Sequence, residues 1–535
     1  MSSEKSARRA FLKSAGVGLA CSGLLALPTS SLAEPATAGV KQRIFDVTEF
    51  GARGDGKALD TPAINRAIEA AATAGGGTVH FPAGTYLCFS IHLKSNVTLD
   101  LSRGSTIIAA DSPTDGKSPG YDLAESNAPW EAYQDYGHNH WHNSLIWGVG
   151  LENIAITGPG LIWGRGLSRG TGLPKAESPG VGNKSIALKN CHNVLLRDFS
   201  IRHGGHFGIL ATGVDNFTID NLKIDTNRDG MDIDCCRNVR ITQCSVNSPW
   251  DDGICLKSSY ALGYARATEL VTISDCVVSG SYQEGTLLDG TFQPISPDEK
   301  HIPRNGRIKC GTESNGGFKN ITIANCICEG CRGLALESVD GALLEDVTIT
   351  NITMRGAVDG PMFIRLGARM RGPAGIPVGT LRRVIISNVA CSGALSSICS
   401  IITGIPGHPI EGLKLSNIFI QHVGGGTKED AALVPPENEN GYPEPKRFGH
   451  TPANGFFIRH VNDIDMSNIS ISEMSADARP AFVLDDVHGA SFFDIKTPRV
   501  PGVPVMVLEN VTDFDISRSN AVADTKLDTV VKKVL

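Results

Sequence analysis

The fold is decided by three short stretches in the middle of the chain: NVLL at 193–196, NFTI at 216–219 and NVRI at 238–241. Each begins with asparagine and continues with apolar residues at alternate positions, the pattern of a strand that buries one face. Their starting points, 193, 216 and 238, lie 23 and 22 residues apart. A strand motif that returns at this interval indicates a solenoid, in which every repeat forms one coil.

Related stretches begin at 96, 153, 320 and 346, so the repeat covers much of the chain. We predict an all-β fold, a right-handed parallel β-helix. Leucine-rich repeats share the period but their leucine pattern is absent, and a β-propeller, the alternative, needs longer units. Two stretches rich in proline or glycine, 281–306 and 424–453, break the repeat and are predicted to be loops on the solenoid wall.

A helix is predicted before the first repeat, ending at the three glycines at 75–77. Asp60 or Thr61 can cap it and Pro62 suits its first turn. Apolar residues then recur at helical spacing: Ala63, Ile64, Ala67, Ile68 and Ala71. We expect this helix to cover the strand edges that a solenoid exposes at its end.

The N-terminus resembles a twin-arginine export signal, because Arg8 and Arg9 precede a mildly apolar stretch at 15–27. We predict a signal peptide at 1–38, a single catalytic domain at 39–535, and a periplasmic or secreted protein with no stable membrane insertion after signal removal. Cleavage after Ala33 is a second possibility for the processing site. The alternative is a chance arginine pair before an uncleaved anchor.

Composition argues against two classes of protein. A formal net charge of -7 offers no basic face, so we predict no nucleic-acid partner. Separately, we expect a monomer. The chain has 14 cysteines, but four recur beside similar strand motifs and are predicted to be buried, stacked, reduced thiols: Cys191, Cys244, Cys276 and Cys326. Metal ligation by Cys326, Cys328 and Cys331 is the alternative.

The candidate chemistry lies in three aspartates. Asp229 precedes Asp251 by 22 residues and Asp252 by 23, which is one repeat. Residues one coil apart stack at roughly 4.8 Å, so the three carboxylates are predicted to share one patch of wall. When carboxylates cluster, the pKa of at least one of them is raised. Pairs of carboxyl groups are the usual catalytic residues of glycoside hydrolases. The alternative is that Asp229 and Asp252, each followed by glycine, are turn residues.

From about residue 44 to beyond 480 the chain resembles glycoside hydrolase family 28, the polygalacturonase family of the pectin-lyase-like superfamily. The family's Asn-Thr-Asp-Gly motif is matched by NRDG at 227–230, with Arg228 in place of threonine, and its Asp-Asp motif by Asp251 and Asp252. The resemblance implies inverting hydrolysis of a pectic poly- or oligosaccharide. Asp251 would be the general acid, and Asp229 and Asp252 would activate water. We predict neither a cofactor nor a bound metal.

The chain also departs from the family pattern. The position of the family's histidine falls near Gly306, and the basic pair that grips a uronate carboxylate aligns with Ala335 and Glu337. The literal RIK at 307–309 lies one coil too early for that motif, and it is either a coincidence or a source of nearby charge. We therefore predict that polygalacturonate is a poor substrate and that a neutral or rhamnogalacturonan-type linkage is better. A cation from another coil is the alternative: Arg228, Arg307, Lys309 or Arg365.

Further polar residues are predicted to contact the sugar. His206 is the replacement for the missing histidine. His140 and His142 alternate with His138 and would share one face of a strand; a metal site or a structural role is the alternative. The remaining predicted substrate-binding residues are Asn227, Lys257, Glu337, Arg307, Lys309 and Arg365.

Two other functions fit the same fold. A calcium-dependent polysaccharide lyase would use an arginine base, for which Arg228 is available. A non-catalytic carbohydrate-binding β-helix would have no reason to stack three aspartates. The long insertions would tend to close one end of a groove, which favours exo-action.

Overall fold

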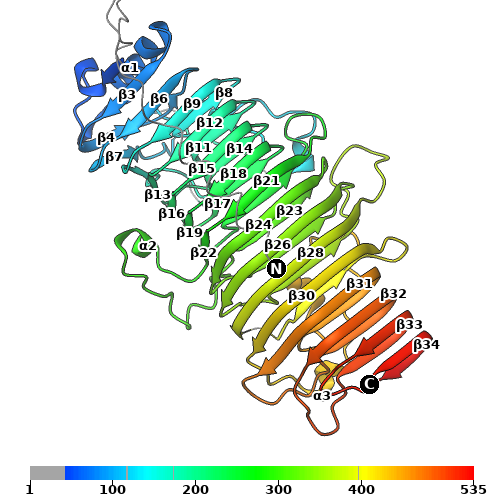
Figure 1. Ribbon diagram of the computed structural model, residues 1–535. Helices are drawn as coiled ribbons and strands as arrows, with labels where there is room; N and C mark the ends of the chain where they lie inside the picture. The colour runs from blue at the N-terminus through cyan, green and yellow to red at the C-terminus, as the bar shows by residue number, and fades with distance from the viewer. Residues whose placement is uncertain (1–42, 116–118, 136, 171, 173, 396) are drawn as a thin grey trace, which may run out of the picture. The chain divides into compact units, whose positions relative to one another are not determined.

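The computed structural model describes residues 43–115, 119–135, 137–170, 172, 174–395 and 397–535 (Figure 1). The predicted signal peptide, with Arg8 and Arg9, lies outside the described residues. Residues 43–535 form one compact unit. Among the described residues, no helix combines the length and the apolar character needed to cross a bilayer.

The unit is built from coils whose strands pair in parallel with the equivalent strands of the next coil, which confirms the parallel β-helix. Each early coil contributes a strand to three walls. The asparagine wall carries the motif that predicted the fold. Its strands are β1 (Ile44–Asp46), β3 (Gly77–Phe81), β6 (Val97–Leu101), β9 (Glu152–Thr157), β12 (His192–Arg197), β15 (Asp215–Asp220), β18 (Arg237–Thr242), β21 (Thr268–Ser274), β24 (Phe318–Glu329), β26 (Leu343–Arg355), β28 (Thr380–Ala394), β30 (Ile410–His422), β31 (Phe456–Glu473), β32 (Phe482–Lys496), β33 (Met506–Ser517) and the antiparallel last strand β34 (Thr525–Val534).

The second wall, called the site wall here, runs beside it. Its strands are β5 (Ile91–His92), β8 (Ile146–Val149), β11 (Lys184–Lys189), β14 (Phe207–Thr212), β17 (Asp229–Asp234), β20 (Ile254–Ser258), β23 (Ile308–Ser314), β25 (Leu334–Ser338), β27 (Met362–Leu366) and β29 (Ser400–Thr403). The third wall comprises β2 (Asp55–Leu59), β4 (Gly84–Cys88), β7 (Ser105–Ala109), β10 (Leu161–Trp163), β13 (Ser200–Arg202), β16 (Lys223–Asp225), β19 (Ser245–Asn247) and β22 (Val277–Ser279).

The asparagines explain why the motif repeats so regularly. Asn193, Asn216 and Asn238 all have a positive φ, a conformation that asparagine tolerates better than most residues. Their side-chain amides also form a ladder: Asn216 donates to Asn193 at 3.0 Å and Asn238 donates to Asn216 at 2.8 Å. The apolar residues that follow are buried in one continuous core.

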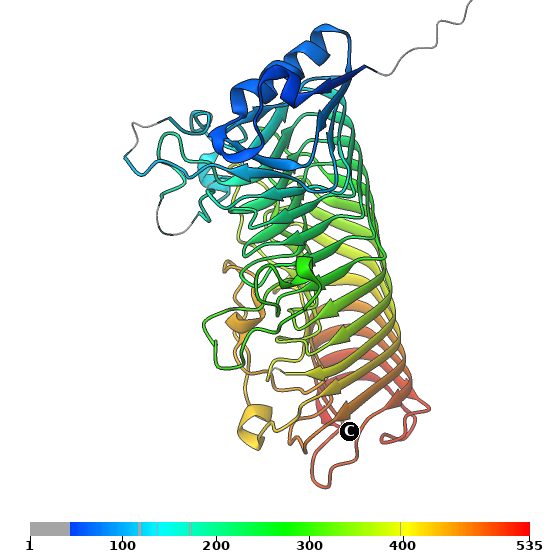
Figure 2. The ribbon, with the colours of Figure 1, turned by 90° about the vertical axis from the view of Figure 1, so that its left-hand side faces the viewer.

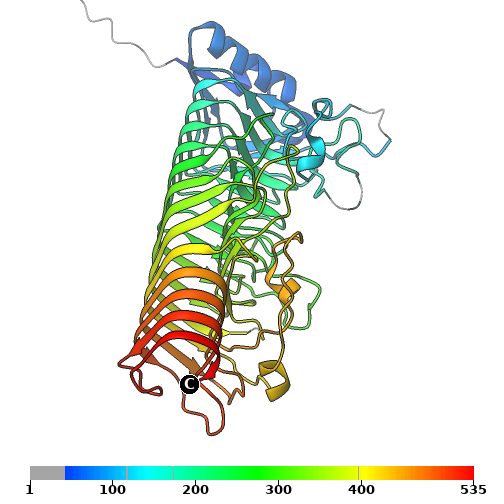
Figure 3. The same ribbon diagram turned by 90° about the vertical axis from the view of Figure 1, so that its right-hand side faces the viewer.

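The capping helix is confirmed as α1 (Thr61–Thr73), whose whole predicted apolar stripe is buried. It contacts β1 and β3 and covers the first coil (Figures 2 and 3). The predicted side-chain cap is wrong in detail. Asp60 occupies the N-cap position, but its carboxylate accepts hydrogen bonds from the backbone of Arg53 and Gly54 instead of the helix.

The two predicted insertions contain no strand: 281–306 carries α2 (Thr286–Asp289), and 424–453 carries α3 (Lys428–Ala431) and the 3-10 helix η3 (Pro445–Phe448). The 3-10 helices η1 (Val47–Phe50) and η2 (Glu131–Tyr133) lie in earlier segments. In Figures 2 and 3 the segments with α2 and α3 project from the same side of the coils.

The cysteines of the described residues are free and buried, as predicted. Cys244, Cys276 and Cys326 stack at one turn, because Ile241, Ile273 and Ile323 are in register before them. Cys191 does not join that stack. It precedes its strand, at the level of Val214 and Cys236, because Val194 pairs with Phe217 and Phe217 with Val239.

Candidate active site

The three aspartates meet where β17 and β20 lie side by side on the site wall. Met231 pairs with Ile254, and this register places Asp229 beside Asp252. Oxygens of Asp229, Asp251 and Asp252 lie within 4.8 Å of one another. The structure therefore brings together the three carboxylates that the one-coil spacing predicted.

Three cations hold these carboxylates. Arg228 donates from Nη2 to Asp251 Oδ2 at 2.6 Å. Arg307 donates from Nε to Asp252 Oδ1 at 2.7 Å, and Lys309 Nζ lies 3.1 Å from Asp252 Oδ2. Arg307 and Lys309 reach Asp252 because Ile308 between them pairs with Ile254 and is buried, so its two neighbours point out of the core.

The pKa values of two neighbouring acids are shifted in opposite directions. Burial, reinforced by the charges of Asp251 and Asp232, holds the pKa of Asp229 well above its usual range. Burial would also raise the pKa of Asp252, but Arg307 and Lys309 outweigh it, and the pKa lies below the usual range. Asp229 therefore keeps a proton to higher pH than Asp252, which places a group suited to hold a proton beside a group suited to act as a base.

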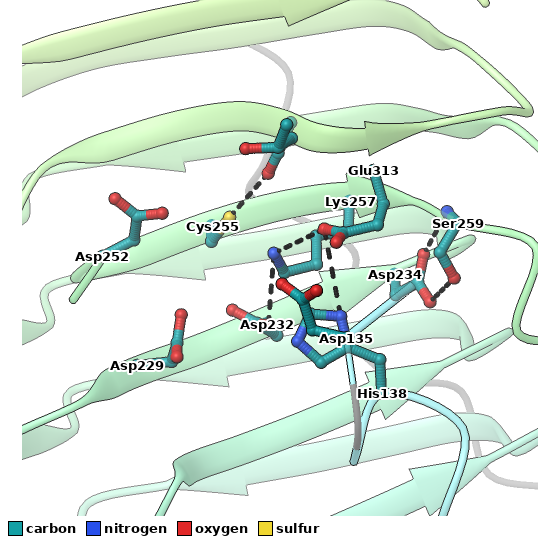
Figure 4. A network of polar contacts seen from close by, with 12 residues as sticks. Asp135, His138, Asp229, Asp232, Asp234, Asp252, Cys255, Lys257, Ser259 and Glu313 are labelled. Carbon is teal, nitrogen blue, oxygen red and sulfur yellow. Dashed lines mark hydrogen bonds and ion pairs between the residues drawn. The ribbon is translucent and has the colours of Figure 1, made fainter. Parts of the chain in front are cut away.

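Behind the aspartates lies a buried ion-pair network (Figure 4). Lys257 Nζ is 3.0 Å from Glu313 Oε2 and 3.7 Å from Asp232 Oδ2, and His138 Nδ1 is 3.9 Å from Glu313. Burial raises the pKa of Asp232 to about 7 and lowers that of His138 to about 4. Lys257 therefore acts within this network and contributes positive charge close to the aspartates.

The aspartates face a cavity of about 290 Å³, called the aspartate pocket here. Three segments far from the aspartates in sequence help to line it: one before β8, one between β10 and β11, and the 424–453 insertion. The lining residues are Asp135, His138, Gly170, Glu177, His206, Arg228, Asp229, Asp251, Asp252, Lys257, Lys309, Glu313 and Tyr442.

Of the predicted histidines, His206 and His138 line this pocket. His206 is the one that we expected to replace the family's histidine. It is buried, stacks on Phe207 at 4.2 Å, and its Nδ1 has no hydrogen-bond partner among the described residues. Burial holds its pKa well below the usual range. It therefore offers a neutral imidazole to a ligand.

The strand predicted for His138, His140 and His142 is wrong, because residues 137–143 form no strand. His138 turns into the aspartate pocket, whereas His140 Nε2 lies 3.3 Å from Glu131 Oε1. His142 packs on Trp147 with ring centroids 4.2 Å apart. His140 and His142 thus lie outside the pocket that holds the aspartates.

Glu337 and Arg365 are also placed differently from the prediction. Glu337 is fully buried behind the pocket, 3.8 Å from Arg307 and 3.6 Å from Lys309, and it accepts a hydrogen bond from Thr312. Arg365 donates to backbone carbonyls of Gly404, Glu437 and Asn438. Neither side chain lines the aspartate pocket: Glu337 fixes the two cations, and Arg365 anchors the 424–453 insertion.

A second cavity, of about 670 Å³, adjoins the first and shares Arg228 and Asp251 with it. It is called the arginine pocket here, and its lining residues are Arg169, Asn227, Arg228, Trp250 and Asp251. Asn227, a predicted contact, is 5% exposed, and neither atom of its amide group has a hydrogen-bond partner among the described residues.

The sequence missed the residues that the 424–453 insertion brings in. Tyr442 lines the aspartate pocket, and Glu444 lies 2.9 Å from Arg307 and 2.8 Å from Arg332. The repeat gives no register for an irregular loop. The only signal was the position of both residues within an insertion expected to shape a cleft.

The three clustered carboxylates are close enough to approach a metal ion. However, Arg228, Arg307 and Lys309 already neutralise Asp251 and Asp252 at 2.6–3.1 Å. A metal would have to displace these cations, so we assign the cluster no metal.

Comparisons with known proteins agree with the β-helix fold. A family model described as rhamnogalacturonase A/epimerase, pectate lyase-like, matches residues 44–118, and one described as right handed beta helix region matches 177–298. A probable polygalacturonase of Vitis vinifera is 23% identical over 410 residues, covering 70% of this chain and 73% of that protein. An exo-poly-alpha-D-galacturonosidase of Dickeya chrysanthemi is 26% identical over 265 residues, covering 39% of this chain and 41% of that protein.

The chain is polygalacturonase-like. The solved structure of a Yersinia enterocolitica family 28 exopolygalacturonase has the same fold, with a TM-score of 0.62 and 19% identity, covering 86% of this chain and 79% of that one. In this polygalacturonase-like chain, the RIK at 307–309 is not a coincidence of sequence. Its two basic residues contact Asp252 from the next coil.

Proposed function

We propose that this chain is a glycoside hydrolase that cleaves pectin-type poly- or oligosaccharides with inversion. The observation that carries the proposal is that Asp229, Asp251 and Asp252, with oxygens within 4.8 Å of one another, line one cavity. The pKa of Asp229 is raised and that of Asp252 is lowered, which fits a division of acid and base roles within the cluster. Asp252 activates the attacking water and Asp251, whose side chain is 26% exposed, donates a proton to the leaving oxygen. Asp229 shares in positioning the water.

Inversion rests on the family resemblance, because the closest carboxylate oxygens, within 4.8 Å, are nearer than the ~6.5–9.5 Å common in inverting enzymes. Proton NMR of a fresh digest tests it. We expect the product to appear first as the anomer opposite to that of the cleaved bond. Initial formation of the same anomer would contradict the proposal.

A neutral sugar in the aspartate pocket is favoured by the charges that line it. Six carboxylates face three arginine or lysine side chains, and each of these cations already pairs with a carboxylate. A uronate carboxylate buried there would lack a compensating partner. We therefore propose that a rhamnogalacturonan-type linkage is cleaved faster than polygalacturonate. Comparing initial rates on fragments of both polymers tests this, and faster cleavage of polygalacturonate would refute it.

A lyase reaction is less well supported. Its base would have to be unprotonated, and Arg228 is the candidate that sequence offers. Burial lowers the pKa of Arg228, but the opposing effect of Asp251 and Asp229 is larger, so the pKa lies above its usual range. Arg228 therefore stays charged in the free site.

We also propose exo-action, because residues outside the coils line the aspartate pocket and narrow it. These are Asp135 and His138 from the segment before β8 and Tyr442 from the 424–453 insertion. Release of single sugars at the start of digestion is the expected sign.

The protein is proposed to be an exported monomer. Cell fractionation of the wild type and of a variant with lysine at positions 8 and 9 tests the route, and unchanged processing would contradict it.

A further inference from the structure

The arginine pocket adjoins the aspartate pocket at the Arg228–Asp251 ion pair, since these two residues line both cavities. An acid that protonates a leaving oxygen lies between the sugar that is attacked and the sugar that leaves. With the attacked sugar against Asp229 and Asp252, the leaving sugar occupies the arginine pocket.

Two side chains of the arginine pocket are suited to bind a sugar. Asn227 is 5% exposed with both atoms of its amide group unpartnered among the described residues, so it can donate to one hydroxyl and accept from another. Trp250 is 43% exposed, and its ring offers a flat apolar face against which a sugar ring can stack.

The charge of this pocket is the reverse of that of its neighbour. Two arginines and one carboxylate line it, and the carboxylate, Asp251, is held by Arg228 at 2.6 Å. Arg228 is 24% exposed and also lies 4.0 Å from Asp229. Arg169 is 48% exposed, with Glu284 at 3.6 Å. An anion entering from solvent can therefore reach both guanidinium groups.

We propose that the arginine pocket binds a uronate as the leaving sugar, and that its carboxylate draws Arg228 away from Asp251. This rests on the proposed hydrolysis. Released from its cation, Asp251 takes the proton from Asp229, which is left ionised beside the attacking water. Asp251 then gives that proton to the glycosidic oxygen as the carbon–oxygen bond breaks. The attacking water bonds to the anomeric carbon through its oxygen and passes one proton to Asp252, so that a hydroxyl is left on the sugar.

The proton moves within a ring of charged and titratable groups on neighbouring elements. These are Asp232 on β17, Asp252 and Lys257 beside and on β20, Lys309 and Glu313 on β23, and His138 and His206 from the segments before β8 and β14. Among the cations, Lys257 and Lys309 are nearly fully buried in ion pairs, whereas Arg228 is partly exposed. Arg228 is therefore the cation that a ligand can recruit.

The test compares two oligosaccharides that differ only in the leaving residue, a free uronate or its methyl ester. We expect wild-type kcat/KM to be at least 10-fold higher for the free acid. Arg228→Gln should reduce this ratio at least 10-fold, with lower kcat on the free acid and higher kcat on the ester, because Asp251 no longer needs to be released. Arg228→Lys should keep part of the preference. A merely structural role would lower both rates alike.

The outcomes separate this inference from the proposed function. If the wild type cleaves neither substrate, the hydrolase proposal fails. If it cleaves both equally, or if Arg228→Gln keeps the wild-type preference, the uronate site alone is refuted. Trp250→Ala provides a second measurement on an exposed side chain. It should raise KM for the free acid at least threefold, and an unchanged KM would contradict a sugar in this pocket.

Discussion

Asp252 is prepared as a base by two residues of the next coil. Arg307 and Lys309 bind one carboxylate oxygen each, at 2.7 and 3.1 Å, and both cations are in turn held by Glu337. Glu337, which we expected to meet the sugar, thus fixes the cations that lower the pKa of Asp252. The packing of consecutive coils thus explains both why Glu337 does not face the sugar and why Asp252 is ionised easily.

Replacing Lys309 should move the acidic limb of the pH–rate profile. The base is active only when ionised, so activity falls as the pH falls through its pKa. Lys309→Met removes a cation that lowers the pKa of Asp252, so the acidic limb of kcat/KM should shift to higher pH. Lys414→Met, at an exposed lysine paired with Asp465, is the control and should leave the profile unchanged. A Lys309→Met profile that matches the wild type would show that Asp252 is not the base.

A ladder of asparagine side chains joins successive strands of the asparagine wall from β6 to β18. Asn216 has a φ of 52°, donates to Asn193 and accepts from Asn238. The side chain thus satisfies a backbone need and a contact between coils at once. This explains why the asparagine motif predicted the fold so directly.

Asn216→Ala should lower the free energy of unfolding by about 1–3 kcal/mol, from backbone strain at positive φ and lost amide hydrogen bonds. Asn216→Gly keeps the backbone freedom and should cost less. Urea unfolding of the three proteins measures both effects. Equal losses for alanine and glycine would show that the conformation at this position contributes little.

The inserted segments are the elements that sequence could not place. Arg307 contacts Glu444, 137 residues away, and Arg371 contacts Asp135, 236 residues away. A repeat predicts neighbours one coil apart, such as Asp229 and Asp252, but not partners joined through irregular loops. The prediction that His140 and His142 contact the sugar was wrong for the same reason. It assumed the alternating side-chain directions of a strand in a segment that is not a strand.

Across the whole molecule, the stacked coils place two adjoining cavities of opposite charge at Asp251. The coil period predicted the β-helix and the aspartate cluster, and apolar residues at helical spacing predicted the capping helix. All three depend on local patterns or on one-coil spacing. The second cavity depends on Arg169, Asn227 and Trp250, which come from three different coils and share no motif. Its recognition required the structure.

The central claim is that the aspartate cluster hydrolyses pectic glycosidic bonds. The most direct measurement is product analysis of wild-type and Asp251→Asn protein on polygalacturonate and rhamnogalacturonan fragments, with circular dichroism to confirm that the variant is folded. We predict saturated sugars with new reducing ends from the wild type, and a kcat lower by about 10²–10⁴ in the variant. A folded Asp251→Asn protein with near wild-type turnover, or an unsaturated product from the wild type, would contradict the account.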